Sequence, residues 1–175
     1  MRNLLVAALA VLTLGGCYEL PHPIFHHGHR ALVVGTYECS GMTQSCRDTI
    51  TESSTGLIWK SYRYTNSSGE TLTMRNIGGT TFAAQIESKD GIYISYFDIP
   101  GPHRFLIRTP DLLRHTNAIN ALSSETHVTS RTSERNKDFI SLSGTDKNLE
   151  AFVTGHNPDF LTTVMDCKSV TSYGL

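Results

Sequence analysis

The sequence TTFAAQIESKDGIYISYFDI, residues 80–99, decides the fold class of this chain. Its first half alternates polar and apolar side chains, which places Phe82, Ala84 and Ile86 on one face of a strand. Its second half is apolar or aromatic on both faces, and the Asp90-Gly91 pair between the halves favours a tight hairpin turn. We therefore expect an antiparallel hairpin whose second strand is covered on both sides, beneath a helix or lining an interior cavity.

Other segments of strand composition lie on both sides of this hairpin. Turn-forming residues such as Asn66-Ser67-Ser68-Gly69 separate them. Short strands at intervals of about ten residues are typical of an antiparallel barrel or sandwich. We predict one mainly β domain over residues 31–175, with a lipocalin-like cup among the forms it could take. The further strands expected are residues 31–37, 57–65, 70–77, 126–132, 139–143, 149–154 and 160–168.

One segment has the pattern of a helix instead. Thr109-Pro110-Asp111 supplies a capping residue, a proline suited to the first helical position and an acid for the first turn. Apolar side chains then recur at helical spacing from Leu112 to Leu122. We predict a single amphipathic helix near residues 110–123, with one face packed on the sheet.

Aromatic side chains are concentrated on two of the expected strands. One strand carries Trp59, Tyr62 and Tyr64, and the other carries Tyr93, Tyr96 and Phe97. Tyrosine and tryptophan are frequent at recognition surfaces and equally ordinary in β-barrel cores. The sequence leaves both roles open.

The cysteines allow more than one disulfide. Besides Cys17 the chain has Cys39, Cys46 and Cys167, and three thiols cannot all pair internally. Cys39 and Cys46 flank a segment suited to a loop, so a bridge between them would staple a hairpin, and we favour this pairing. The alternative joins one of them to Cys167, and the longer closed loop would be the more stabilising. Sequence alone does not fix the connectivity.

Residues 17–30 have the composition of a flexible tether, rich in proline and histidine. His22, His26, His27 and His29 could bind Zn²⁺ or Cu²⁺ through neutral imidazoles. The alternative is a solvated linker that binds no metal. Nothing else in the chain predicts a cofactor.

The remaining composition excludes other classes of function. With 15 Lys and Arg against 16 Asp and Glu, the chain is near neutral, and no basic run in it predicts binding to nucleic acid. It lacks a Gly-x-Ser-x-Gly nucleophile motif, a His-Glu-x-x-His zinc motif and a glycine-rich phosphate loop. We therefore do not expect an enzyme.

The first seventeen residues have the pattern of an export signal. Arg2 precedes an apolar run from Leu4 to Leu14, which is too short to span a bilayer but suits the core of a signal peptide. The ending Leu14-Gly15-Gly16-Cys17 resembles the bacterial lipobox. This resemblance implies cleavage between Gly16 and Cys17, leaving residues 1–16 as a removed signal peptide.

The same resemblance implies a lipid anchor. The Cys17 sulfur would carry a diacylglyceryl group and its amino group a further acyl chain such as palmitate, and two or more chains give stable anchoring. Tyr18, in place of an aspartate, favours transfer to the outer membrane. We expect a lipoprotein on the periplasmic face of that membrane.

Two families resemble parts of the remaining chain. Gly35-Thr36-Tyr37 followed by two cysteines resembles the opening of NlpE-like envelope lipoproteins, although six residues separate Cys39 from Cys46 where that family has Cys-x-x-Cys. Tyr37-Glu38-Cys39 with the late Cys167 resembles membrane-bound lysozyme inhibitors, whose inhibitory serine-rich loop is missing here. Both resemblances imply a small β-barrel.

These features predict a binding protein. We expect a membrane-anchored module that binds another envelope protein, either in envelope assembly or as an inhibitor of a toxin or lytic enzyme. The alternative is a periplasmic carrier of a small apolar ligand or a metal ion. A large apolar cavity would favour the carrier, and a filled core with an exposed aromatic patch would favour the protein-binding module.

Overall fold

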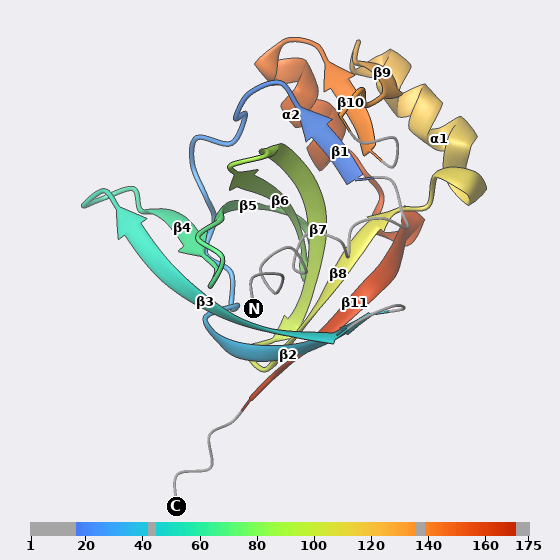
Figure 1. Cartoon of the computed structure of the whole chain (residues 1–175). Helices are drawn as coiled ribbons and strands as arrows, with labels where there is room; N and C mark the ends of the chain where they lie inside the picture. Colours follow the sequence, from blue (N-terminus) through green and yellow to red (C-terminus); the bar gives the residue numbers. More distant parts are fainter. Residues whose placement is uncertain (1–16, 42–44, 136–138, 171–175) are drawn as a thin grey trace, which may run out of the picture.

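A computed structural model describes residues 17–41, 45–135 and 139–170. Eight of its strands close an antiparallel barrel (Figure 1), which confirms the mainly β fold with barrel architecture. The barrel strands are β2 (Gly35–Gly41), β3 (Ser45–Thr55), β4 (Ser61–Thr65), β5 (Thr71–Gly78), β6 (Thr81–Ser88), β7 (Gly91–Gly101), β8 (Arg104–Pro110) and β11 (Leu161–Ser169).

The order of the strands explains how the barrel closes. Strands β2 to β8 follow one another as a meander in which each pairs with the next. The last strand, β11, then inserts between β8 and β2 and completes the ring. The expected hairpin of residues 80–99 is β6–β7, with Phe82 opposite Phe97.

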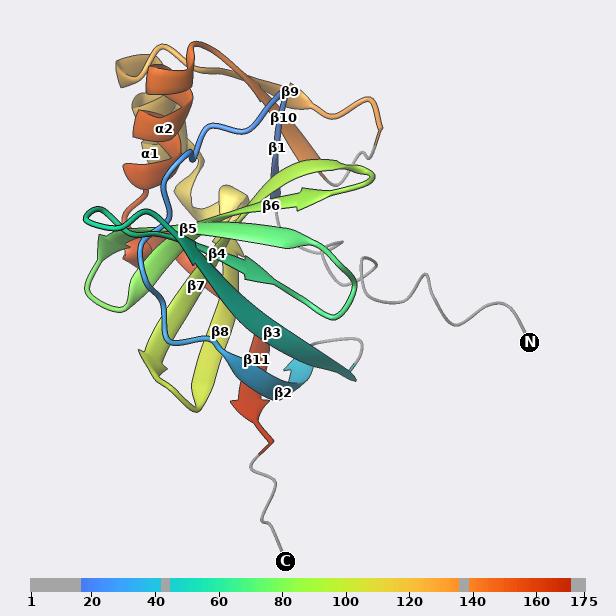
Figure 2. The same ribbon diagram turned by 90° about the vertical axis from the view of Figure 1, so that its left-hand side faces the viewer.

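The chain between β8 and β11 forms a cap on one side of the barrel, as Figure 2 shows. Strand β1, from the start of the described chain, joins this cap by pairing antiparallel to β7 and parallel to β10. The elements of the cap are β1 (Cys17–Leu20), α1 (Leu112–Glu125), β9 (Thr129–Thr132), β10 (Phe139–Ser143), α2 (Asp146–Thr154) and the 3₁₀ turn Pro158–Phe160.

Strand β7 separates two hydrophobic cores. Its residues Phe97 and Ile99 point into the barrel, where they pack with Tyr37, Met74 and other interior side chains. Its residues Ile94 and Tyr96 face the other way and pack against the cap. A strand buried on both faces lacks a regular polar alternation, which explains why apolar residues occur on both faces of residues 92–99.

The segment after β1 is an ordered strap, so the prediction of a flexible tether over residues 17–30 is wrong. The buried Gln85 side chain accepts hydrogen bonds from the backbone amides of Ile24 and Phe25, at 2.7 and 2.9 Å. Further along, Gly28 lies so close to Tyr62 that a Cβ there would be 1.9 Å from the Tyr62 carbonyl oxygen. Buried apolar side chains hold the segment in place, despite its proline and histidine content.

The strap also closes one end of the barrel. Ala31 and Val33 are buried in the interior core. The backbone of Ala31 both donates to and accepts from the Tyr64 hydroxyl. The strand expected over residues 31–37 therefore begins only at Gly35.

Among the residues that it describes, the structure has two α-helices where the sequence predicted one. Helix α1 confirms the expected amphipathic helix, with Asp111 as its N-cap, while Pro110 still belongs to β8. Residues 149–154, expected as a strand, lie in α2. There Leu149, Phe152 and Val153 are buried at helical spacing, and the Thr145 side chain caps the helix by accepting a hydrogen bond from the Asn148 amide.

Candidate functional site

The β3–β4 hairpin presents three consecutive, highly exposed apolar residues. Its turn carries Leu57, Ile58 and Trp59, whose exposed fractions are 99, 86 and 89 %. We call these three residues the hairpin tip. Figure 1 shows the hairpin projecting from the side of the barrel. Residues 57–60, expected as part of a strand, form this turn instead, because β4 begins at Ser61.

The local sequence fixes the shape of this turn. Thr55 pairs with Ser61 at the last position of the ladder. Gly56 adopts a positive φ of 92°, and a Cβ there would lie 2.3 Å from the Trp59 carbonyl oxygen. Only glycine tolerates this conformation without strain. The turn therefore holds three large side chains outside the barrel, where no part of the described chain covers them.

Three consecutive exposed apolar side chains are unusual on a soluble surface. Isolated exposed apolar residues are common, but contiguous ones mark contact sites. Burying each of these side chains against a partner would contribute roughly 1.5–3 kcal/mol. The hairpin tip is therefore the strongest candidate for a binding surface.

Basic side chains lie beside the hairpin tip. Lys60 and Arg63 are exposed on the hairpin. Arg30 of the strap forms an ion pair with Glu52, at 3.8 Å between Nε and Oε2, and its guanidinium lies 5.9 Å from the centre of the Tyr62 ring. A surface complementary to the tip would thus combine an apolar pocket with acidic groups at its rim.

The other aromatic residues have mainly structural roles. Tyr64, Tyr93, Tyr96 and Phe97 are buried. Tyr62 is half-buried against Arg30, so only Trp59 presents its ring to solvent. The sequence pattern could not separate these roles, because exposure depends on where the barrel ends and the hairpin continues.

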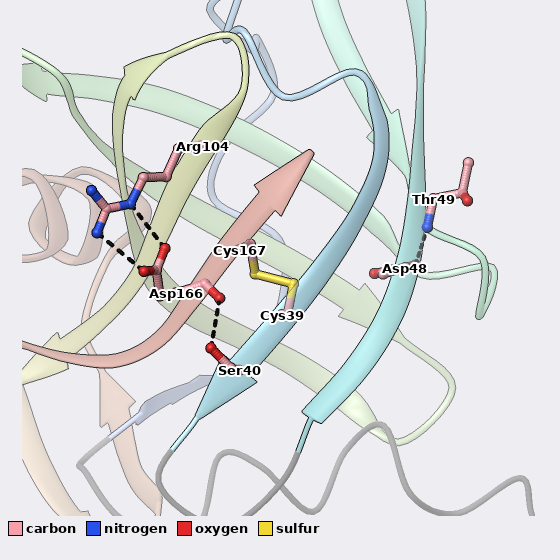
Figure 3. The surroundings of a disulfide bond; sticks show 7 residues. All are labelled: Cys39, Ser40, Asp48, Thr49, Arg104, Asp166 and Cys167. Carbon is pink, nitrogen blue, oxygen red and sulfur yellow. Dashed lines mark hydrogen bonds and ion pairs between the residues drawn. A yellow bond between two sulfur atoms is a disulfide. The ribbon is translucent and has the colours of Figure 1, made fainter. Parts of the chain in front are cut away.

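The disulfide joins Cys39 to Cys167, so the favoured pairing of Cys39 with Cys46 is wrong. Figure 3 shows the bond crossing from β2 to β11. Cys39 lies directly opposite Cys167 on one neighbouring strand and opposite Cys46 on the other. Proximity in sequence indicated only Cys46 as a neighbour of Cys39, because β11 with Cys167 comes from the far end of the chain. The bond fastens the seam at which the barrel closes.

Cys46 remains a free, half-buried thiol beside this disulfide. Burial, and to a smaller extent the nearby Asp48 carboxylate, raises the pKa of its thiol. At neutral pH the thiol is therefore protonated and a poor nucleophile.

Cys17 has a free thiol at the first position of β1. Its side chain packs with Tyr93 and Phe139, and burial raises its pKa to about 12. Leu14, Gly15 and Gly16, the other residues of the expected lipobox, lie outside the described residues, as does the rest of the expected signal peptide. A lipid on the Cys17 sulfur would have to displace this side chain from its contact with Tyr93 and Phe139.

The four histidines of residues 17–30 are not brought together. The His22 ring bonds to Asp146 at 2.7 Å, and the His29 ring accepts a hydrogen bond from the Asn76 amide at 3.2 Å. His26 and His27 are exposed. Across the described part of the chain, no three His, Cys, Asp or Glu side chains form a group that could hold a metal ion. The zinc or copper site that the sequence allowed is therefore not formed among the described residues.

No family model, curated protein or solved structure matches this chain. Within residues 17–41, 45–135 and 139–170, no helix combines the length and apolar character needed to cross a membrane. The class that the fold and the site define is a capped antiparallel barrel with an exposed apolar hairpin tip.

Proposed function

We propose that this chain is a bacterial envelope lipoprotein that binds another envelope protein through its hairpin tip. A lipid on Cys17 would hold it on the periplasmic face of the outer membrane. The partner would be a component of envelope assembly, or a toxin or lytic enzyme that the protein inhibits. The observation that carries the proposal is the near-complete exposure of Leu57, Ile58 and Trp59.

The placement of the hairpin favours a protein over the anchoring bilayer as the partner of the tip. In both views the hairpin tip lies at one edge of the molecule, well away from the start of β1 (Figures 1 and 2). A lipid at Cys17 would hold the membrane on the side of β1. The hairpin tip would then extend toward the periplasm, where it could reach a protein surface.

The small free volume inside the barrel favours a function in surface binding over the transport of a large ligand. Its cavity of about 140 Å³ is smaller than the roughly 300–1,000 Å³ of sites for drug-sized ligands. Most of the interior is filled by packed side chains. A barrel packed in this way is a rigid support that can present the hairpin at low entropic cost.

The test is a comparison of two exposed apolar sites. Leu113 on α1 is 96 % exposed, so Leu113→Ser is a matched control for Trp59→Ser. The full-length protein and both variants are cross-linked in envelope extracts, and the captured partner is purified for affinity measurements. Because a central tryptophan contributes about 2–4 kcal/mol to an interface, we expect Trp59→Ser to weaken binding at least roughly thirtyfold.

The controls separate this proposal from its alternatives. Leu113→Ser should bind the partner like the unchanged protein. Equal capture by all three proteins would reject the hairpin tip as the binding site. If the protein self-associates and Trp59→Ser abolishes this, the partner would be a second copy of the chain. If the protein binds protein-free lipid vesicles and Trp59→Ser abolishes this, the partner would be a bilayer.

A further inference from the structure

The barrel interior contains an apolar cavity that is independent of the hairpin tip. Its volume is about 140 Å³, and no residue of the strap is among those that line it. Apolar side chains from several strands form most of its wall. They include Leu72, Ile86, Phe97, Phe105, Ile107 and Met165.

One polar group in this wall has no partner. Ser95 of β7 is 1 % exposed, and its hydroxyl has no hydrogen-bond partner among the residues that the structure describes. Its neighbours Ile94 and Tyr96 face the cap, so alternation along the strand directs Ser95 into the barrel. A buried hydroxyl without a partner costs roughly 1–3 kcal/mol. A bound molecule that hydrogen-bonds to Ser95 would remove this cost.

The mouth of the cavity lies between the start of β3 and the β4–β5 turn. There the Asp48 carboxylate accepts hydrogen bonds from the backbone amide and the hydroxyl of Ser67, which holds the turn across the opening. The charged groups that line the cavity, Arg47, Asp48 and Glu70, belong to this rim. The deeper wall is apolar, so an ion would lose its hydration there without compensation.

We infer that the barrel binds a small uncharged molecule, about the size of benzene, that carries one hydrogen-bonding group. Apolar cavities of about 150 Å³ in proteins hold benzene, which sets the size of the ligand. The ring or short chain of the ligand fills the apolar volume, and its polar group bonds to the Ser95 hydroxyl. Phenol has this chemistry and serves as the probe, with benzene as the matched molecule that lacks the hydroxyl.

The test is calorimetric titration of the full-length protein with phenol and with benzene. Phenol should bind more tightly than benzene, because only phenol satisfies Ser95. Ser95→Ala should weaken phenol binding roughly fivefold, the effect of about 1 kcal/mol for one neutral hydrogen bond, and leave benzene binding unchanged. Ser54→Ala, at an exposed serine of β3, should bind both probes like the unchanged protein.

A cavity-filling substitution locates the binding. Ile86→Phe should abolish binding of both probes, and Ile107→Phe provides the same test if the first variant does not fold. Saturable binding that persists in a folded, filled variant would place the probes elsewhere and overturn the inference. Lack of phenol binding to the unchanged protein would also overturn it, as would equal phenol affinity in Ser95→Ala. None of these results depends on the hairpin tip, so this inference and the proposed function can fail separately.

Discussion

His156 is a buried histidine that its surroundings keep neutral. It is 3 % exposed, and among the described residues neither ring nitrogen has a hydrogen-bond partner. Its ring packs against Tyr18 of β1, Tyr96 of β7 and Phe152 of α2, so it joins two elements of the cap to the barrel. Desolvation by burial lowers its pKa from 6.5 to about 4.

This depressed pKa predicts a loss of stability in acid. The unfolded chain binds a proton at His156 below about pH 6.5, while the folded chain resists it down to about pH 4. The contribution of the neutral His156 ring to the free energy of unfolding is therefore complete above pH 6.5 and is lost as the pH falls toward 4. Its size is on the order of 3 kcal/mol. Urea unfolding between pH 4 and 7.5 should show a shallower decline for His156→Phe, whereas His103→Phe, at an exposed histidine, should retain the decline of the unchanged protein.

At the scale of elements, the disulfide determines how firmly the barrel is closed. Cys39 and Cys167 lie 128 residues apart in sequence, on the two strands that meet at the seam. Next to the bond, Arg104 of β8 holds the Asp166 carboxylate through two hydrogen bonds, at 2.9 and 3.1 Å (Figure 3). Hydrogen bonding from Arg104 lowers the pKa of Asp166. A covalent and an ionic link therefore fasten β11 on its two sides.

The register predicts what happens when this bond is removed. Peptide mapping without reduction should recover Cys39 linked to Cys167, and Cys46→Ser should leave that link intact. Cys167→Ser should lower the free energy of unfolding by roughly 2–5 kcal/mol. It should also let Cys39 bond to Cys46, which lies opposite it on β3. A Cys39–Cys46 link in the unchanged protein would contradict the structure.

The limits of sequence analysis are visible in the same elements. The alternation in residues 81–88 and the Asp90-Gly91 turn predicted β6 and β7 correctly, because hairpin pairing is local. The seam between β2 and β11 could not be predicted, since it joins residues distant in sequence. Residues 149–154 form too short an apolar run for its spacing to distinguish a strand from a short helix. The exposure of the hairpin tip could not be predicted either, because Leu57, Ile58 and Trp59 have the same composition as a buried strand.

At the scale of the whole molecule, an anchor at Cys17 would determine how the domain meets the membrane. Because β1 begins at Cys17 and is paired on both sides, no free tether separates the anchor from the folded chain. The cap around β1 would therefore lie near the lipid surface, with the hairpin tip at another edge of the molecule (Figure 1). Lipidation would have to occur before the first residue of β1 docks between Tyr93 and Phe139, because the docked thiol is buried and protonated.

The anchor itself can be tested by metabolic labelling with palmitate. Cys17→Ala removes the sulfur that the lipobox resemblance assigns to the lipid, so this variant should incorporate no palmitate and should either remain uncleaved or be released from membranes. Cys46→Ala, the same change at the other free thiol, should be labelled and membrane-bound like the unchanged protein. Continued labelling of Cys17→Ala would reject the lipid anchor. A bilayer is disfavoured as the partner of the hairpin tip only because of this anchor, so it would then have to be reconsidered as that partner.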